Sequence, residues 1–88
     1  MVGLFPALLV LAAGAIPELD QARQLFAKTD FQAAVKLIEG MPQKTGAAYE
    51  LMGRSHYLMG DYKKATQAFE KALVDDRSNA AYHHWLGR

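Results

Sequence analysis

The sequence contains no cysteine among its 88 residues. This absence excludes disulfide bonds, thiolate metal sites, cysteine nucleophiles and lipidation at cysteine. Charge of one sign is not in excess either, since the formal net charge is +1. Bulk electrostatics therefore do not favour a nucleic-acid or membrane-surface binder. A chain of this length forms one small domain at most.

Charged residues are also missing from the first seventeen positions, "MVGLFPALLVLAAGAIP". A helix over residues 4–16 would be about 20 Å long, too short for a bilayer core of about 30 Å. The segment has the length of a signal-peptide apolar region, and Ala13-Gly14-Ala15 has the small-x-small pattern of a cleavage site, although no Lys or Arg precedes it. Residues 1–16 are predicted to be a signal peptide that exports the protein to the periplasm or outside the cell. The alternatives are an apolar helix packed on the domain or resting on a membrane, or an anchor, and the protein would then be cytoplasmic or membrane-associated.

Two helices are predicted directly after this segment. The first, "PELDQARQLFAK", begins at Pro17, and the second, "FQAAVKLIE", follows Asp30, whose carboxylate can cap it. Gly40 can end the second helix in the left-handed conformation, and Pro42 cannot continue it. The apolar residues at helical spacing are Leu19, Ala22, Leu25 and Phe26 in the first helix, and Phe31, Ala34, Val35 and Ile38 in the second.

Two longer helices follow, separated by Gly60-Asp61. The third helix is predicted to start near residues 45–47, and the fourth to run from Tyr62 to about Val74. Glycine can adopt a conformation that other residues avoid, and aspartate can cap a helix, so the pair predicts a turn between antiparallel helices. One side of the third helix carries Ala48, Leu51, Met52, Ser55, Leu58 and Met59, and one stripe of the fourth carries Tyr62, Ala65, Phe69, Ala72 and Leu73.

Small and large residues are distributed so that these two helices can pack closely. Gly53, Ala65 and Ala72 allow a close approach, and Tyr62, Phe69 and Leu73 are expected to fill the space between the helices. Asp75 and Asp76 oppose the negative end of the helix dipole, so the fourth helix should end there. Ser78 or Asn79 can cap a fifth helix, "AAYHHWLGR".

The helical pairs form an internal repeat. "TDFQAA" at residues 29–34 is echoed by "GDYKKA" at residues 60–65, a spacing of 31, and "MGR" at residues 52–54 recurs as "LGR" at residues 86–88, a spacing of 34. A helix–turn–helix unit therefore occurs about two and a half times. A single such unit cannot bury its apolar face, which favours stacking of the units.

Residues 45–79 resemble a tetratricopeptide repeat (TPR), of the kind found in proteins that bacteria export. The matching residues are Tyr49, Met52, Gly53, Tyr57, Gly60, Asp61, Tyr62, Ala65, Phe69, Ala72, Leu73 and Asn79. Residues 17–44 resemble a degenerate repeat and residues 80–88 the first helix of a truncated one, while Arg77 stands where the family often has proline. The resemblance implies an all-α fold in which antiparallel helix–turn–helix repeats stack as an α-solenoid.

The resemblance also implies that the first helix of each repeat lines a concave groove that binds a peptide or a partner helix. The corresponding partner-binding candidates in this sequence are Arg23, Phe26, Glu50, Arg54, Tyr57, His84 and Arg88, with Leu19 beside the first two. An arginine recurs at one equivalent position in all three units, and its planar fork suits carboxylates, so an acidic or C-terminal peptide is the expected partner. The alternative is that these arginines are only solvated surface residues.

No catalytic, cofactor or metal site is predicted. His83 and His84 are adjacent and point about 100° apart on a helix, unlike the i, i+4 pairs that bind zinc. Ser55 and His56 are adjacent too and cannot form a nucleophile–base pair. We expect a non-catalytic protein-interaction module, with no nucleic-acid or small-molecule partner. The alternative is a structural segment of a longer helical-repeat protein, or a chain that self-associates through Trp85 and Leu86.

Overall fold

The computed structural model describes residues 16–77 and 80–87, without the side chains of residues 80–82. These residues form five α-helices and contain no β-strand, so the predicted all-α class is confirmed for them. The helices are α1 (Pro17–Ala27), α2 (Phe31–Glu39), α3 (Gly46–Leu58), α4 (Tyr62–Asp75) and α5 (Ala80–Leu86).

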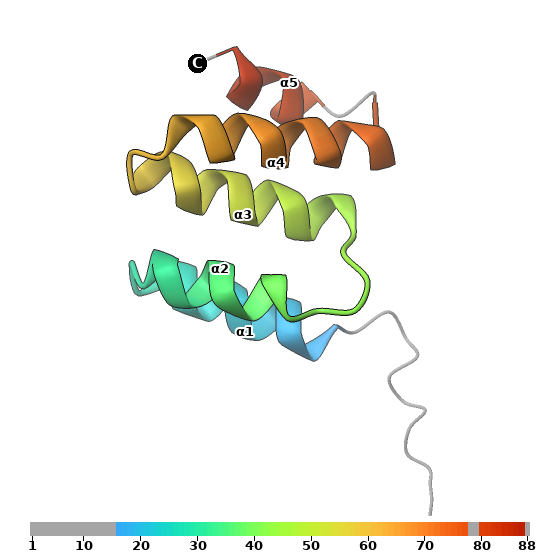
Figure 1. Ribbon diagram of the computed structural model, residues 1–88. Coiled ribbons are helices and arrows are strands. Elements are labelled where there is room, and N and C mark those ends of the chain that lie inside the picture. The colour runs from blue at the N-terminus through green and yellow to red at the C-terminus, as the bar shows by residue number, and fades with distance from the viewer. Residues whose placement is uncertain (1–15, 78–79, 88) are drawn as a thin grey trace, which may run out of the picture.

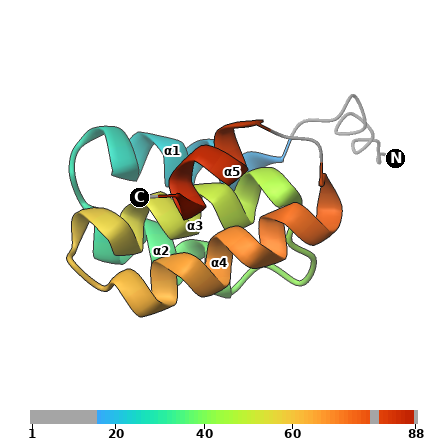
Figure 2. The ribbon, with the colours of Figure 1, turned by 90° about the horizontal axis from the view of Figure 1, so that it is seen from above.

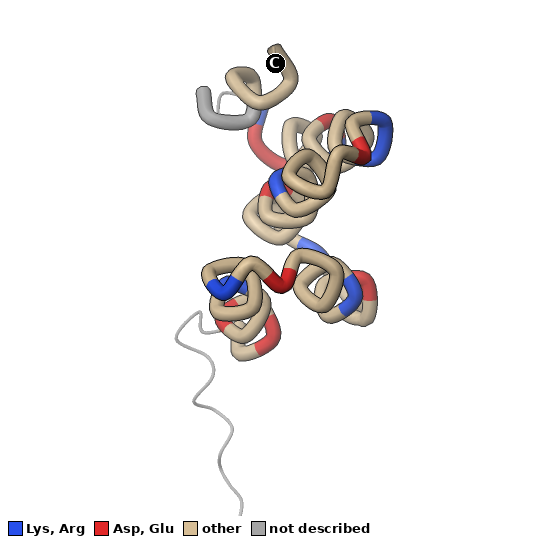
Figure 3. The backbone as a smooth tube through the Cα atoms, turned by 90° about the vertical axis from the view of Figure 1, so that its left-hand side faces the viewer, with Lys and Arg blue, Asp and Glu red and all other residues tan. Residues whose placement is uncertain are grey.

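The helices form two antiparallel hairpins and a final short helix. The α1–α2 hairpin lies at one end, the α3–α4 hairpin follows it, and α5 lies on the second hairpin, with both hairpin turns at the same edge (Figure 1). Seen from above, α1 and α5 lie to one side of the molecule and α2 and α4 to the other (Figure 2). Each of the first four helices carries both basic and acidic residues, so none of the four has one sign of charge alone (Figure 3).

The starts of α1, α2 and α4 follow the predicted chemistry, and the cap of α3 by Thr45 was not predicted. Pro17 is the first residue of α1, and Thr45 caps α3 by accepting a hydrogen bond from the amide of Ala48 at 3.2 Å. Asp30 and Asp61 cap α2 and α4 through their Oδ1 atoms, each at 3.3 Å from the amide nitrogen three residues on. The two hairpin turns therefore have the same aspartate cap, at positions separated by the spacing of 31 seen in the sequence.

Two further features repeat at this spacing. Thr29 has a φ of 63° and Gly60 a φ of 84°, so both turns contain a residue in the left-handed region. The rings of Phe26 and Phe31 lie 5.2 Å apart between centroids, and so do those of Tyr57 and Tyr62, with interplanar angles of 61° and 55°. The spacing of 31 thus relates positions of matching local geometry.

The close approach of α3 and α4 depends on Gly53. A Cβ atom at this position would lie 2.6 Å from Cε1 of Phe69, closer than real side chains come. Phe69 is itself fully buried, so its ring has little room to move. Glycine is required here by space, as the sequence predicted for a small residue.

Three predicted details are wrong. Gly40 ends α2 with a φ of −79°, a right-handed conformation. Its amide donates a hydrogen bond to the carbonyl of Lys36, as within the helix, so the chain does not reverse direction at this residue. Tyr62 is 61% exposed and does not fill the space between α3 and α4, since it begins its helix at the turn. Leu58 and Met59 are also exposed, because α3 ends at the same turn and none of the described helices covers them.

Asp75 has a role that the helix dipole alone did not predict. It is the last residue of α4, and its Oδ2 accepts a hydrogen bond from the amide of Gly46, the first residue of α3, at 2.9 Å. A carboxylate at a helix N-terminus is favourable because it satisfies a free amide and faces the positive end of the dipole. The carboxylate of Asp75 is therefore unfavourable at the end of α4 but favourable at the start of α3.

Some predictions lie outside the described residues. These are the signal peptide or apolar helix at residues 1–15, the cap at Ser78 or Asn79, and the position of Arg88. Within the described ranges, none of the helices has the length and apolar character needed to cross a membrane.

Candidate functional site

Arg54 of α3 lies between two aromatic side chains from other helices. Its guanidinium carbon is 4.9 Å from the ring centroid of Phe26 in α1 and 5.6 Å from that of Trp85 in α5. Cations at such distances from a ring are attracted by the negative face of its π-system. One arginine thereby connects three helices that are far apart in the sequence.

Further rings extend this contact into the second hairpin. Trp85 stacks on Phe69 with a centroid distance of 5.6 Å and an interplanar angle of 13°. It also meets Tyr57 edge to face at 5.4 Å. We call Phe26, Arg54, Tyr57, Phe69 and Trp85 the arginine–aromatic cluster.

The polar environment of Arg54 is incomplete. Its nearest carboxylate is Glu50, one turn earlier in α3, at 4.0 Å, which is too long for a hydrogen bond. The Nε atom of Arg54 is buried and has no hydrogen-bond partner among the described residues. The side chain as a whole is 37% exposed, so part of the guanidinium faces solvent. The cluster therefore presents a cation whose orientation is set by rings.

The structure brings together four of the seven predicted site residues. Phe26, Arg54 and Tyr57 belong to the cluster, and Glu50 lies beside it. Arg23 does not join them, because its side chain is 55% exposed and lies 3.4 Å from Asp20 on its own helix. His84 is exposed, with its ring centroid 6.3 Å from that of Trp85.

Two members of the cluster were not among the predicted site residues. Phe69 was expected only in the core, and Trp85 only as a residue for self-association. The repeat gave no signal for Trp85, since the second and third units are related by a spacing of 34, which pairs Arg54 with Arg88. Arg54 and Trp85 each pack on an aromatic residue of the preceding unit, Arg54 on Phe26 and Trp85 on Tyr57.

Ser55 and His56 have separate environments. Ser55 is fully buried, and its hydroxyl donates a hydrogen bond to the carbonyl of Leu51 at 2.8 Å. The Nδ1 atom of His56 is buried and has no partner among the described residues. In the part of the chain that the structure describes, no three His, Cys, Asp or Glu residues gather closely enough to hold a metal ion.

Comparison with known proteins finds no matching family model, no matching curated protein and no matching solved structure.

Proposed function

We propose that this chain is a non-catalytic protein-interaction module of the TPR type, which binds a peptide or a partner helix on the face formed by α1, α3 and α5. The observation that carries the proposal is the position of Arg54 between Phe26 and Trp85. Arg54, Phe26, Tyr57 and Trp85 are partly exposed, and arginine and large aromatic residues are among the types that contribute most binding energy at protein interfaces.

Arg54 is suited to bind a partner because little of its freedom remains to be lost. A free arginine side chain carries roughly 2 kcal/mol of rotamer entropy, and its planar fork is already oriented here by two rings. Glu50 at 4.0 Å does not saturate the guanidinium. An acidic group of a partner is therefore the expected contact, and its carboxylate would approach the fork in its plane.

The proposed architecture is a stack of about two and a half helix–turn–helix units. It is supported by the shared φ sign of Thr29 and Gly60, the equal cap distances at Asp30 and Asp61, and the two matching ring pairs. In this architecture α1, α3 and α5 are the first helices of successive units. Export directed by residues 1–16 is part of the same proposal.

The test is a selection of random peptides on the immobilised chain, followed by binding measurements on charge-reversed variants. Arg54→Glu should abolish binding of the selected peptides, and Arg23→Glu should reduce it only slightly, because Arg23 lies outside the cluster. Circular dichroism establishes that both variants remain helical. If the folded double variant Arg23→Glu, Arg54→Glu retains every selected peptide, the proposed face is not the binding face.

A second candidate is a structural segment with no ligand of its own, in which α5 stacks on further helices or on another copy. It is favoured by Trp85 and Leu86, which are only partly buried and line a hollow of about 60 Å³ with Tyr57, Tyr62 and Phe69. Sedimentation of the wild type and of Leu86→Ser distinguishes the two candidates. An oligomer that Leu86→Ser dissociates supports assembly, and a monomer of wild type that still binds selected peptides supports the interaction module.

A further inference from the structure

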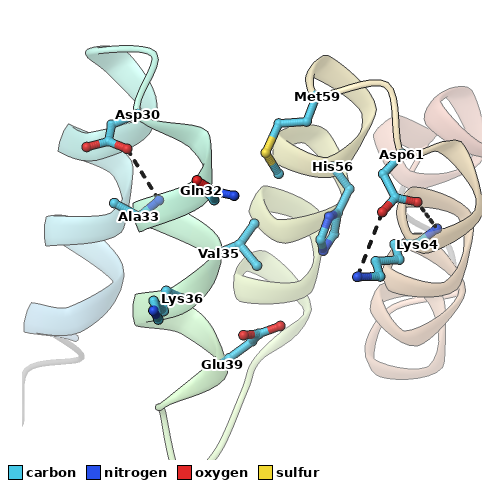
Figure 4. Close-up of a pocket in the computed structure, with 10 residues that line it drawn as sticks. All are labelled: Asp30, Gln32, Ala33, Val35, Lys36, Glu39, His56, Met59, Asp61 and Lys64. Atoms are coloured by element: carbon cyan, nitrogen blue, oxygen red, sulfur yellow. Dashed lines mark hydrogen bonds and ion pairs between the residues drawn. The ribbon is translucent and has the colours of Figure 1, made fainter.

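A second feature lies on the other side of the molecule from α1 and α5, between α2 and the α3–α4 hairpin. It is an open groove of about 830 Å³. Charged side chains line it from both sides, Lys36 and Glu39 from α2 and Asp61 and Lys64 from the turn and α4, and Val35 and Met59 lie between them (Figure 4). The full lining is Asp30, Gln32, Ala33, Val35, Lys36, Glu39, His56, Met59, Asp61 and Lys64. We call it the α2–α4 groove.

His56 is the unusual member of this groove. Only 8% of the residue is exposed, and its Nδ1 atom has no hydrogen-bond partner among the described residues. Figure 4 shows the ring between Val35 of α2 and Lys64 of α4. A buried polar nitrogen without a partner costs free energy, so a ligand that supplies a hydrogen bond there after a small ring adjustment would be favoured.

Some of the charged groups around His56 already have partners in the described part of the chain, and others do not. Asp30 and Asp61 cap helices, and Asp61 also pairs with Lys64 at 3.8 Å. Among the described residues, neither Lys36 nor Glu39 makes an ion pair. The groove contains three carboxylates and two ammonium groups, so one further positive charge would make it neutral.

Burial lowers the pKa of His56 from its ordinary value of 6.5, against the opposing influence of Asp61 and Glu39 and with a contribution from Lys64 in the same direction as burial. His56 is therefore uncharged near pH 7. A neutral imidazole has a free nitrogen that accepts a hydrogen bond, whereas a protonated one can only donate. The groove thus offers an acceptor, an unpaired carboxylate and the apolar side chains of Val35 and Met59.

We propose that the α2–α4 groove binds a basic side chain, Arg or Lys, of a partner peptide. The aliphatic stem lies on Val35 and Met59, the cationic head is balanced by Glu39 and Asp61, and one of its N–H groups donates to His56. This arrangement fits long basic side chains, which bury their stems and keep the charged head near polar groups. An anionic ligand fits less well, because it would add a charge of the sign already in excess.

This site is independent of the face proposed for α1, α3 and α5, and the probe is chosen to separate the two. The tripeptide acetyl-Ala-Arg-Ala-amide is titrated into the ¹⁵N-labelled chain, with acetyl-Ala-Gln-Ala-amide as the uncharged control. The arginine peptide should shift the resonances of Val35, Glu39, His56 and Lys64 to saturation, and the glutamine peptide should not. A third titration uses spermidine, and shifts of the same resonances would indicate that a free polyamine binds to the same groups.

The matched variants are Glu39→Gln, which removes the unpaired carboxylate, and Glu70→Gln, which removes an exposed carboxylate outside the groove. Glu39→Gln should weaken the arginine peptide by about threefold, as expected for a solvent-exposed ion pair, and Glu70→Gln should leave it unchanged. A bound cation should also lower the pKa of His56 further, which its ring resonances report. Equal shifts with the glutamine peptide, an unchanged affinity in Glu39→Gln, or shifts confined to Phe26, Arg54 and Tyr57 would each overturn the proposal.

Discussion

The carboxylate of Asp75 accepts a hydrogen bond from the amide of Gly46 at 2.9 Å, across 29 positions of the sequence. Thr45 accepts from the amide of Ala48 at the same helix start, so two of the free amides of α3 are satisfied by side chains. The other end of the hairpin is held by Gly60 and the Asp61 cap. An acidic side chain therefore caps a helix start at each end of the α3–α4 hairpin, and that of Asp75 also joins the two helices.

Replacement of Asp75 by alanine should lower the free energy of unfolding by about 1 kcal/mol, the usual contribution of a capping side chain. Relief of the unfavourable charge at the end of α4 offsets a few tenths of this. For a domain of this size the melting temperature should fall by about 4–8 °C. Glu70→Ala, at an exposed position of the same helix, is the control and should change it by much less.

Gly53→Ala should destabilise the chain by about 1–3 kcal/mol, although alanine favours helix formation. The added Cβ would lie 2.6 Å from the buried ring of Phe69. Gly40→Ala is the matched control, because its Cβ would meet only backbone oxygens at 3.6 and 3.8 Å and its φ is −79°. Urea unfolding of both variants measures the difference. Similar midpoints for the two variants would mean that α3 and α4 are not in the close contact described.

The residues with positive φ in the two hairpin turns, Thr29 and Gly60, can each be replaced by the other type. Thr29 is a β-branched residue with a φ of 63°, a conformation that costs such residues free energy, whereas Gly60 has a φ of 84° without strain. Thr29→Gly should therefore stabilise the chain by about 1 kcal/mol, and Gly60→Thr should destabilise it by at least as much. Thermal unfolding followed by circular dichroism measures both. A loss of stability in Thr29→Gly would show that its side chain contributes more than the strain costs.

Stability should depend on pH through His56. Burial lowers the pKa of His56 below 6.5 in the folded chain, so the unfolded chain binds the proton more readily. The contribution of neutral His56 is complete above pH 6.5 and is lost as the pH falls from 6.5 through the lower pKa of the folded state. The melting temperature of the wild type should decrease between pH 7.5 and 5.5, and that of His56→Gln should decrease less.

His83→Gln is the control for this pH dependence, since His83 lies exposed on α5. A change of slope in His56→Gln that His83→Gln does not reproduce assigns the pH dependence to His56. If His56→Gln and the wild type lose stability in parallel as the pH falls, another group is responsible for the change.

The helices and their caps were predictable because they depend on neighbours in the sequence. Asp30 and Asp61 each precede an apolar helical stripe, and both cap as expected. Gly60 adopts the positive φ predicted for it, whereas Gly40 does not. Gly60 reverses the chain between the two helices of its hairpin. The residue that does the same in the first hairpin is Thr29, between α1 and α2, whereas Gly40 follows the second helix of that hairpin.

The candidate site was less predictable because it depends on contacts between units. Sequence spacing placed Phe26, Arg54 and Tyr57 on related helical positions. In the structure Arg54 contacts Phe26, and both Arg54 and Tyr57 contact Trp85. It also treated Arg23 as equivalent to Arg54, but Arg23 has no helix on its outer side among the described residues to supply a second ring. The two arginines therefore differ in the residues that surround them, which the residue type alone does not predict.

The stacking of Trp85 on Phe69 gives this chain a built-in optical probe. Trp85 is its only tryptophan, and the ring it rests on also fills the space beside Gly53. The indole emission therefore responds to release of the last helix, whereas the helical signal in circular dichroism responds mainly to the two hairpins. Coincident transitions would indicate that α5 unfolds together with the hairpins, and an earlier change in emission would indicate that it separates first.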